Sequence, residues 1–362
     1  YSNIGRIFNL EEFMKLEEEM MFHLTVGIEK WQREKDAIPD ELKKGHLQLI
    51  GLCIETKQPF PKTIIPELVA FLKKPLHQWG IPSITSHFDG DLSMINEFGE
   101  LSDYFQEWLE MVGSIENERQ KSMKKILEYC TKHALCNEYT IIRRFLTEHP
   151  IIDSISLEAF KLNLHHELAA FVENCYEKLK PFHEISICPY CGWTLERKKG
   201  QLTCTNLCRE LADFINIQTI ELGSQTYYRL KKGIQRFVLL PGIVEIQWFD
   251  HLKKRYKDAE ISLYPKVDEF DILIKKGDIS FHVDVKDYTH PQLLADYFAK
   301  RNSKKYLENK NVIIVVPDYR ERLKPGYIKQ FYARLNDLGL EIPFQVKLQR
   351  DSLKLMDRVL MM

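Results

Sequence analysis

Three residues in the C-terminal third of the chain have the types and spacing of a metal-dependent hydrolytic site: Asp271, Asp284 and Lys286. In the stretch ISFHVDVKDY, residues 279–288, apolar and polar residues alternate as in a β-strand. A period of two puts Asp284 and Lys286 on one face of that strand. An acid and a lysine in this arrangement also form ordinary salt bridges on exposed edge strands, so the pair alone does not decide between these interpretations.

Asp271 favours a metal-dependent hydrolytic site over a surface salt bridge. The turn KKGD at Lys275–Asp278 predicts a hairpin between two strands, and counting outward from the turn brings Asp271 and Asp284 together at its open end. Two adjacent carboxylates repel each other unless a cation lies between them, which predicts a site for Mg²⁺ or Mn²⁺. Lys286 is then able to orient or deprotonate a water molecule, and Glu245 on the preceding helix is a candidate third carboxylate.

The elements that must position these side chains follow the order αβββαβαβ. A helix that crosses over to the apolar run NVIIVVP indicates that part of the sheet is parallel and covered on both faces. The predicted elements are a helix at 243–256, strands near 260–264, 270–275 and 279–286, a helix near 291–307, a strand at 311–317, a helix near 327–338 and a strand at 343–348.

This combination resembles the PD-(D/E)XK nuclease superfamily, to which many restriction endonucleases belong, over about residues 226–350. Within it, the stretches LPGIVEIQWFDHL, YPKVDEFDILI and FHVDVKDYTHPQLLADYF most resemble the restriction-endonuclease-like proteins that accompany prokaryotic PIWI-type proteins (pPIWI-RE) and a helicase in defence islands. Two positions depart from the pattern: Asp284 stands where Glu is common, and Phe270 stands where a Pro often precedes the first Asp.

The resemblance implies Mg²⁺-dependent hydrolysis of phosphodiester bonds in DNA, with RNA as the alternative substrate. Asp271 and Asp284 are then metal ligands, Lys286 lies beside the attacking water and Glu245 is the helix carboxylate. The implied setting is an antiviral or restriction-type defence system, with PIWI-like and helicase partners.

Four of the eight cysteines form a second motif: Cys188-x2-Cys191, twelve residues, then Cys204-x3-Cys208. Two closely spaced thiolate pairs joined by a short hairpin predict a zinc ribbon, and Gly192 suits the turn beneath the metal. Because all four ligands are cysteines, we expect a structural Zn²⁺. Disulfides or a redox Cys-x-x-Cys are the alternatives. The other four cysteines are scattered through helical patterns and are expected to be core residues.

The expected architecture is therefore α+β and multidomain. A helical region at 1–180 of unknown role precedes the ribbon at 181–225 and an αβββαβ restriction-endonuclease-like mixed sheet at 226–362. Amphipathic patterns at 10–24 and 102–130 and a single long helix at 157–180 make up most of the first region.

Charge is divided between the two halves of the chain. Residues 1–180 contain 21 Lys and Arg against 29 Asp and Glu, a net charge of −8, and residues 181–362 contain 30 against 23, a net charge of +7. A polyanion is therefore expected to meet the second half. The candidate phosphate contacts are Arg229, Lys231, Lys232, Arg236, Lys300, Arg301, Lys304 and Lys305.

No apolar run approaches the length of a membrane span, and the start of the sequence lacks a signal-peptide core, so a cytoplasmic location is expected. Two functions from different classes remain open. The chain is either a nuclease or a catalytically weak subunit that uses a nuclease-like fold to bind nucleic acid or a partner. The clustered carboxylates favour the nuclease, because they would repel phosphate in a pure binding module.

Overall fold

The computed structural model describes residues 16–33, 37–112, 121–180, 184–198, 200–215, 217–222, 224–300 and 304–361. The chain divides into two compact units, Tyr1–Ile115 and Glu116–Met362.

In its described part, the first unit is built from helices. Helices α1 and α2 approach closely at two glycines: a Cβ at Gly27 would lie 2.4 Å from the backbone nitrogen of Leu42, and one at Gly45 would lie 2.7 Å from that of Leu24. Only glycine permits this separation of the helices. The elements are α1 (Leu16–Arg33), α2 (Asp40–Glu55), η2 (Ile64–Leu68), α3 (Val69–Leu72), η3 (Leu76–Trp79), α4 (Pro82–Thr85) and α5 (Asp103–Val112).

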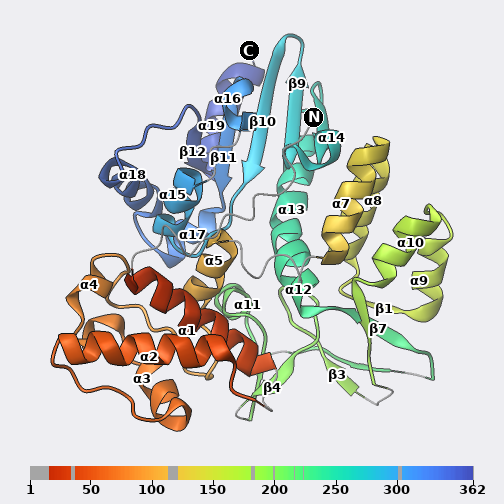
Figure 1. Ribbon diagram of the computed structural model, residues 1–362. Coiled ribbons are helices and arrows are strands. Elements are labelled where there is room, and N and C mark those ends of the chain that lie inside the picture. The colour runs from red at the N-terminus through yellow and green to blue at the C-terminus, as the bar shows by residue number, and fades with distance from the viewer. Residues whose placement is uncertain are drawn as a thin grey trace. The chain divides into compact units, whose positions relative to one another are not determined.

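The second unit contains a five-stranded mixed sheet (Figure 1), as the alternation and the apolar run predicted. Its strand order is β12-β11-β10-β9-β8; the β8–β9 and β9–β10 pairs are antiparallel, and the β10–β11 and β11–β12 pairs are parallel. The strands are β8 (Glu260–Leu263), β9 (Ile272–Lys276), β10 (Ile279–Val285), β11 (Val312–Val316) and β12 (Gln345–Leu348).

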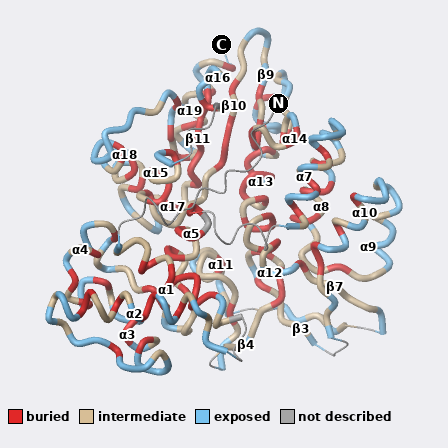
Figure 2. Tube along the Cα trace, in the orientation of Figure 1, coloured by how far each residue is buried: buried red, intermediate tan, exposed pale blue. Residues whose placement is uncertain are grey.

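Helices cover both faces of this sheet, and Figure 2 shows buried residues concentrated on β10, β11 and the helices beside them. One face packs against α13 (Leu240–Arg255), with Val283 and Ile313 in the same core as Trp248. On the other face, Ile314 packs with Phe298 of α15 (Pro291–Lys300). The predicted parallel pairing and two-sided cover are confirmed. The remaining elements of this region are α14 (Pro265–Asp268), α16 (Lys304–Glu308), α17 (Asp318–Leu323), α18 (Tyr327–Asp337) and α19 (Gln349–Leu360).

The helix expected near 291–307 corresponds to α15 and α16, between which residues 301–303 lie outside the described part. The single helix expected at 157–180 is wrong. Two helices and a strand replace it, and the side chain of Asn163 donates to the carbonyl of Ala159 at the break. Helices α17 and α19 were not predicted.

The elements between the first unit and α13 are α7 (Lys121–His133), α8 (Cys136–Glu148), β1 (Ile151–Asp153), α9 (Ser154–Lys161), α10 (His166–Glu173), β2 (Tyr176–Lys178), β3 (Glu184–Ser186), β4 (Glu196–Lys198), β5 (Gln201–Thr203), α11 (Asn206–Leu211), β6 (Thr219–Glu221), β7 (Tyr227–Leu230), α12 (Lys232–Ile234) and η4 (Gln235–Leu239).

Three small sheets surround the cysteine motif. Strand β7 lies between β1 and β2, β3 pairs with β6, and β4 pairs with β5, all antiparallel. The border expected at residue 180 therefore falls inside the second unit, because β2 before the motif is hydrogen-bonded to β7 after it. Helices α7 and α8 belong to the same unit, where α8 packs against α13.

None of the described helices is both long enough and apolar enough to span a lipid bilayer.

Candidate active site

The β9–β10 hairpin brings Asp271 and Asp284 together. Its register pairs Ile272 with Val283, so one step toward the open end places Asp271 opposite Asp284. The backbone amide of Val285 donates a 2.6 Å hydrogen bond to Oδ2 of Asp271. Asp271 and Asp284 are 8% and 1% exposed. Because β10 lies between β9 and β11, the pair belongs to the interior of the sheet, and the alternative of an exposed edge strand is wrong.

Oδ2 of Asp284 is surrounded by donors. The ammonium groups of Lys305 and Lys286 lie 2.9 and 3.3 Å from it, and the hydroxyl of Tyr306 donates a hydrogen bond to it. Burial opposes ionisation of Asp284, but Lys286 and Lys305 outweigh it and lower its pKa to about 2. Asp284 therefore carries its negative charge at neutral pH.

The pKa of Asp271 is shifted in the opposite direction to that of Asp284. Burial, together with the negative charges of Glu245 and Asp284, raises its pKa well above the ordinary range, against the influence of Lys286. A carboxyl group with a raised pKa beside an ionised one is the donor set that a divalent cation stabilises, since the ion offsets the repulsion and binds both oxygens. The two aspartates thus fit one Mg²⁺ or Mn²⁺.

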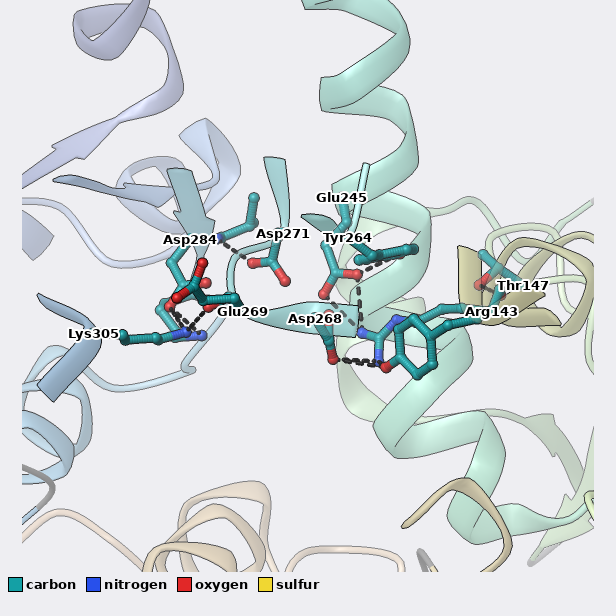
Figure 3. A network of polar contacts seen from close by, with 12 residues as sticks. Arg143, Thr147, Glu245, Tyr264, Asp268, Glu269, Asp271, Asp284 and Lys305 are labelled. Atoms are coloured by element: carbon teal, nitrogen blue, oxygen red, sulfur yellow. Dashed lines mark hydrogen bonds and ion pairs between the residues drawn. The ribbon is translucent and has the colours of Figure 1, made fainter. Parts of the chain in front are cut away.

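Glu245 is 3% exposed on α13, and both of its oxygens bind protein groups (Figure 3). Arg143 Nη2 lies 3.2 and 3.0 Å from Oε1 and Oε2, and the hydroxyl of Tyr264 donates a 2.7 Å hydrogen bond to Oε2. In the described ranges, Glu245 does not join Asp271 and Asp284 in a set of three possible ligands within 4.8 Å of one another. Glu245 acts on Asp271 through its charge, while Arg143 balances that charge.

The sequence analysis missed Arg143, Tyr264 and Tyr306. Arg143 had a detectable signal: it lies four residues after Tyr139 and three before Leu146 on the apolar face of α8, where an unpaired arginine would be costly. Tyr264 and Tyr306 are ordinary aromatic residues in their local patterns and gave no such signal.

The predicted phosphate contacts have different surroundings in the structure. The guanidinium of Arg229 donates to Glu177 and Thr194, both at 2.7 Å, and lies over the ring of Trp193. Lys305 binds Asp284 and, at 2.7 Å, the carbonyl of Glu269.

The remaining candidate phosphate contacts differ in how far their side chains are exposed. Exposed side chains are found at Lys231, Lys232 and Lys300, and Arg236 is partly buried beside Phe237. Arg301 lies outside the described residues, as does the side chain of Lys304.

The four predicted cysteine ligands converge. The sulfurs of Cys188, Cys191, Cys204 and Cys208 all lie within 4.8 Å of one another, and those of Cys191 and Cys204 are 3.7 Å apart. Zn–S bonds of about 2.3 Å in a tetrahedron place sulfurs about 3.8 Å apart, so the cluster fits a closed zinc site. All eight cysteines are free thiols. Outside the cluster, Cys136 is exposed, against the expectation that it is a core residue.

Residues of the second unit that lie outside the cysteine motif contact this cluster. Gln235 of η4, 1% exposed, donates its side-chain amide to the sulfurs of Cys191 and Cys204 at 3.7 and 3.3 Å. Tyr190, between the first two cysteines, interacts with Tyr319, whose hydroxyl donates a 2.6 Å hydrogen bond to Asp287. The cysteine cluster is thus connected to the residue that follows Lys286.

Residues 242–349 match the model of a protein family described as "REase associating with pPIWI_RE". Neither the curated proteins nor the solved structures contain a match to this chain. The matched segment runs from α13 through β12, and so includes Glu245, Asp271, Asp284 and Lys286. This confirms the resemblance inferred from the motifs: the C-terminal sheet region is similar to the restriction-endonuclease-like family that associates with pPIWI_RE.

Proposed function

We propose that this chain is a nuclease that uses Mg²⁺ or Mn²⁺ to hydrolyse phosphodiester bonds in DNA. The observation that carries the proposal is the buried pair Asp271 and Asp284 on neighbouring strands, with Lys286 3.3 Å from Asp284. Burying two carboxylates side by side is unfavourable without a cation, and a binding module gains nothing from it.

The roles of the side chains follow from their charges. Asp271 and Asp284 would hold the cation, which when bound supplies Lewis-acid stabilisation of the phosphate and a more acidic water. Asp284 restrains Lys286, and its negative charge raises the pKa of the lysine against the effect of burial, so the ammonium form persists. In that form Lys286 donates hydrogen bonds that orient the attacking water and offset the negative charge that develops on the phosphate oxygens.

The cysteine cluster would bind one structural Zn²⁺. Its closed set of four thiols leaves no position for a substrate, and Gln235 and Tyr190 connect it to the nuclease region. Exposed Lys231, Lys232 and Lys300 remain the candidate contacts to the phosphate backbone.

The family description supports a functional association with a PIWI-type protein. We propose that the two act together in a prokaryotic defence system against foreign DNA. The partner would present or select the nucleic acid, and this chain would cut it.

The test is cleavage by the purified full chain, alone and with its PIWI-type partner, on single- and double-stranded DNA and RNA in Mg²⁺, Mn²⁺ or EDTA. Metal-dependent products that disappear in Asp284→Asn support the nuclease. Products that persist in this variant and in EDTA would refute it.

A second candidate function rests on a specific observation. Lys305 and Arg143 already neutralise Asp284 and Glu245 within the protein. A site whose charges are balanced in this way suits a subunit that keeps the fold to bind nucleic acid or the partner without cutting. Tight DNA binding by a wild-type chain that binds no Mn²⁺ would favour this alternative.

A further inference from the structure

Arg143 is a buried arginine that reaches the candidate active site from outside the family match. It lies on α8, almost one hundred residues before the matched segment at 242–349. Its side chain is 10% exposed, and that of its partner Glu245 is 4% exposed. Its Nη1 also lies 3.6 Å from Oδ2 of Asp268. One guanidinium therefore joins α8, α13 and the 264–268 loop that leads into β9, within which α14 is a single irregular turn with non-helical φ angles at Lys266 and Val267.

That loop has a strained backbone. Tyr264, Lys266, Val267 and Asp268 all have positive φ angles, between 51° and 69°, a conformation that costs free energy for residues other than glycine. The loop ends at Asp271, whose carbonyl accepts a 2.8 Å hydrogen bond from the amide of Tyr264. Contacts that hold the loop thus also hold the backbone of Asp271.

The network around Arg143 supplies such contacts (Figure 3). Tyr139 donates a 2.7 Å hydrogen bond to Asp268, and Tyr264 donates one of the same length to Glu245. The guanidinium lies 4.8 Å from the centre of the Tyr264 ring. Both ends of the strained loop are therefore bound to Arg143 or to its partners.

We propose that Arg143 is a positioning residue for the metal site. It fixes Glu245 and the loop 264–268, and through them sets Asp271 opposite Asp284 in the geometry that binds the divalent ion. This inference deepens the proposed function and rests on it. It also gives part of the N-terminal helical region a role, because α8 contributes to the active site.

Charge and shape both matter in this role. Without Arg143, Glu245 becomes an unbalanced buried carboxylate beside Asp271, and the strained loop loses one of the two contacts from α8 that hold Asp268. A lysine preserves the charge but cannot bind both oxygens of Glu245 from one planar group while reaching Asp268. Arg143→Lys therefore keeps the positive charge beside Glu245 and removes the contacts that position the loop, so it tests the contacts alone.

The ordinary alternative is that Arg143 only stabilises the fold. Arg144 provides the matched control: it lies next to Arg143 on α8 and also reaches α13, through an exposed pair with Asp250 at 3.6 Å, with a second pair to Glu148 at 2.7 Å. Arg144→Gln removes two ion pairs from the same helix, both more exposed than the Arg143–Glu245 pair, without touching the loop.

The experiment measures Mn²⁺ binding by calorimetry to the full chain that retains its zinc but has been freed of Mg²⁺ and Mn²⁺, and cleavage as a function of Mg²⁺ concentration. In Arg143→Lys, metal affinity should fall roughly 10- to 100-fold, as it does when groups that orient metal ligands are lost. Excess Mg²⁺ should restore most of kcat, and KM for DNA should not change. Tyr264→Phe, which loses only the hydroxyl bound to Glu245, should shift metal affinity in the same direction by a smaller factor, and Arg144→Gln should match wild type.

Wild-type metal affinity in Arg143→Lys, or an equal loss in Arg144→Gln, would overturn the inference. So would a fall in melting temperature accompanied by lower kcat at every Mg²⁺ concentration. If the wild type binds Mn²⁺ but never cuts DNA, the nuclease proposal fails. In that case a weaker affinity in Arg143→Lys would still uphold the positioning role.

Discussion

The amide of Val285 donates a 2.6 Å hydrogen bond to Oδ2 of Asp271, so the residue between Asp284 and Lys286 holds the opposing carboxylate. Asp271 lies one position before β9, and this bond extends the hairpin beyond the strand. Backbone pairing between β9 and β10 therefore positions the two carboxylates. A substitution can remove the charge of one of these side chains while the backbone of the site stays in place.

Asp271→Asn should abolish cleavage and raise thermal stability at the same time. The pKa of Asp271 is raised, so its charged form is unfavourable in the folded protein at neutral pH, whereas an amide oxygen can still accept from Val285. We expect a loss of activity of about 100-fold or more and a higher melting temperature in buffer without Mg²⁺ or Mn²⁺. Asp278→Asn, in the exposed turn of the same hairpin, is the control and should leave both unchanged. A lower melting temperature in Asp271→Asn would contradict the assignment.

Lys286→Met should separate metal binding from chemistry. The substitution retains both carboxylates and most of the aliphatic chain but removes the ammonium 3.3 Å from Asp284. Calorimetry should still detect Mn²⁺ binding, and DNA should still bind, while single-turnover cleavage falls by about 100-fold or more. Equal cleavage by wild type and Lys286→Met would assign any observed activity to another site or to a contaminant.

Lys305→Met should affect the metal rather than the DNA. Lys305 lies 2.9 Å from Oδ2 of Asp284, where it competes with a divalent ion, so its removal should lower the half-saturating Mg²⁺ concentration. Each lysine that binds phosphate contributes about one unit to the salt dependence of DNA affinity. We expect that slope to be flatter in Lys231→Met with Lys232→Met and unchanged in Lys305→Met. The opposite pattern would return Lys305 to the phosphate-binding surface.

Cys204→Ser should release one zinc ion per chain. The thiolate is one of four in a closed set, and it also accepts the hydrogen bond from Gln235, so its loss should loosen both the cluster and η4. Elemental analysis measures the zinc, and hydrogen exchange measures the protection of 235–239. Cys136→Ser, at an exposed thiol on α8, should retain zinc and protection. Wild-type protein that contains no zinc when purified without chelators would exclude a zinc site.

The hairpin and its charges were predictable because they depend on local rules. A period of two fixed the faces of β10, Gly277 with φ of 57° allowed the tight turn, and together these gave the register that opposes Asp271 and Asp284. The four cysteines were recognisable in the same way, because the ligand spacing within each pair is a property of a short segment.

What escaped prediction depends on contacts between distant segments. Arg143 and Glu245 are 102 residues apart, and no sequence rule pairs an arginine on one amphipathic helix with an acid on another. Lys305 looked like part of a basic surface because its local pattern does not reveal that it reaches Asp284. Strands β1 and β2 are three residues long, too short for alternation to be visible, and they form because β7 pairs with both.

The strands that flank the cysteine cluster pair in a nested order: β2 with β7, β3 with β6 and β4 with β5. The polypeptide thus leaves the rest of the second unit and returns to it along adjacent backbone positions, with Lys178 opposite Tyr228. A segment attached in this way is the connection between the two strands of one antiparallel pair, β2 and β7. The length of this connection can therefore differ without changing the strand order on either side of it. Its content is restrained, because Trp193 donates a 2.7 Å hydrogen bond to the carbonyl of Leu230 and Gln235 donates to the sulfurs of Cys191 and Cys204.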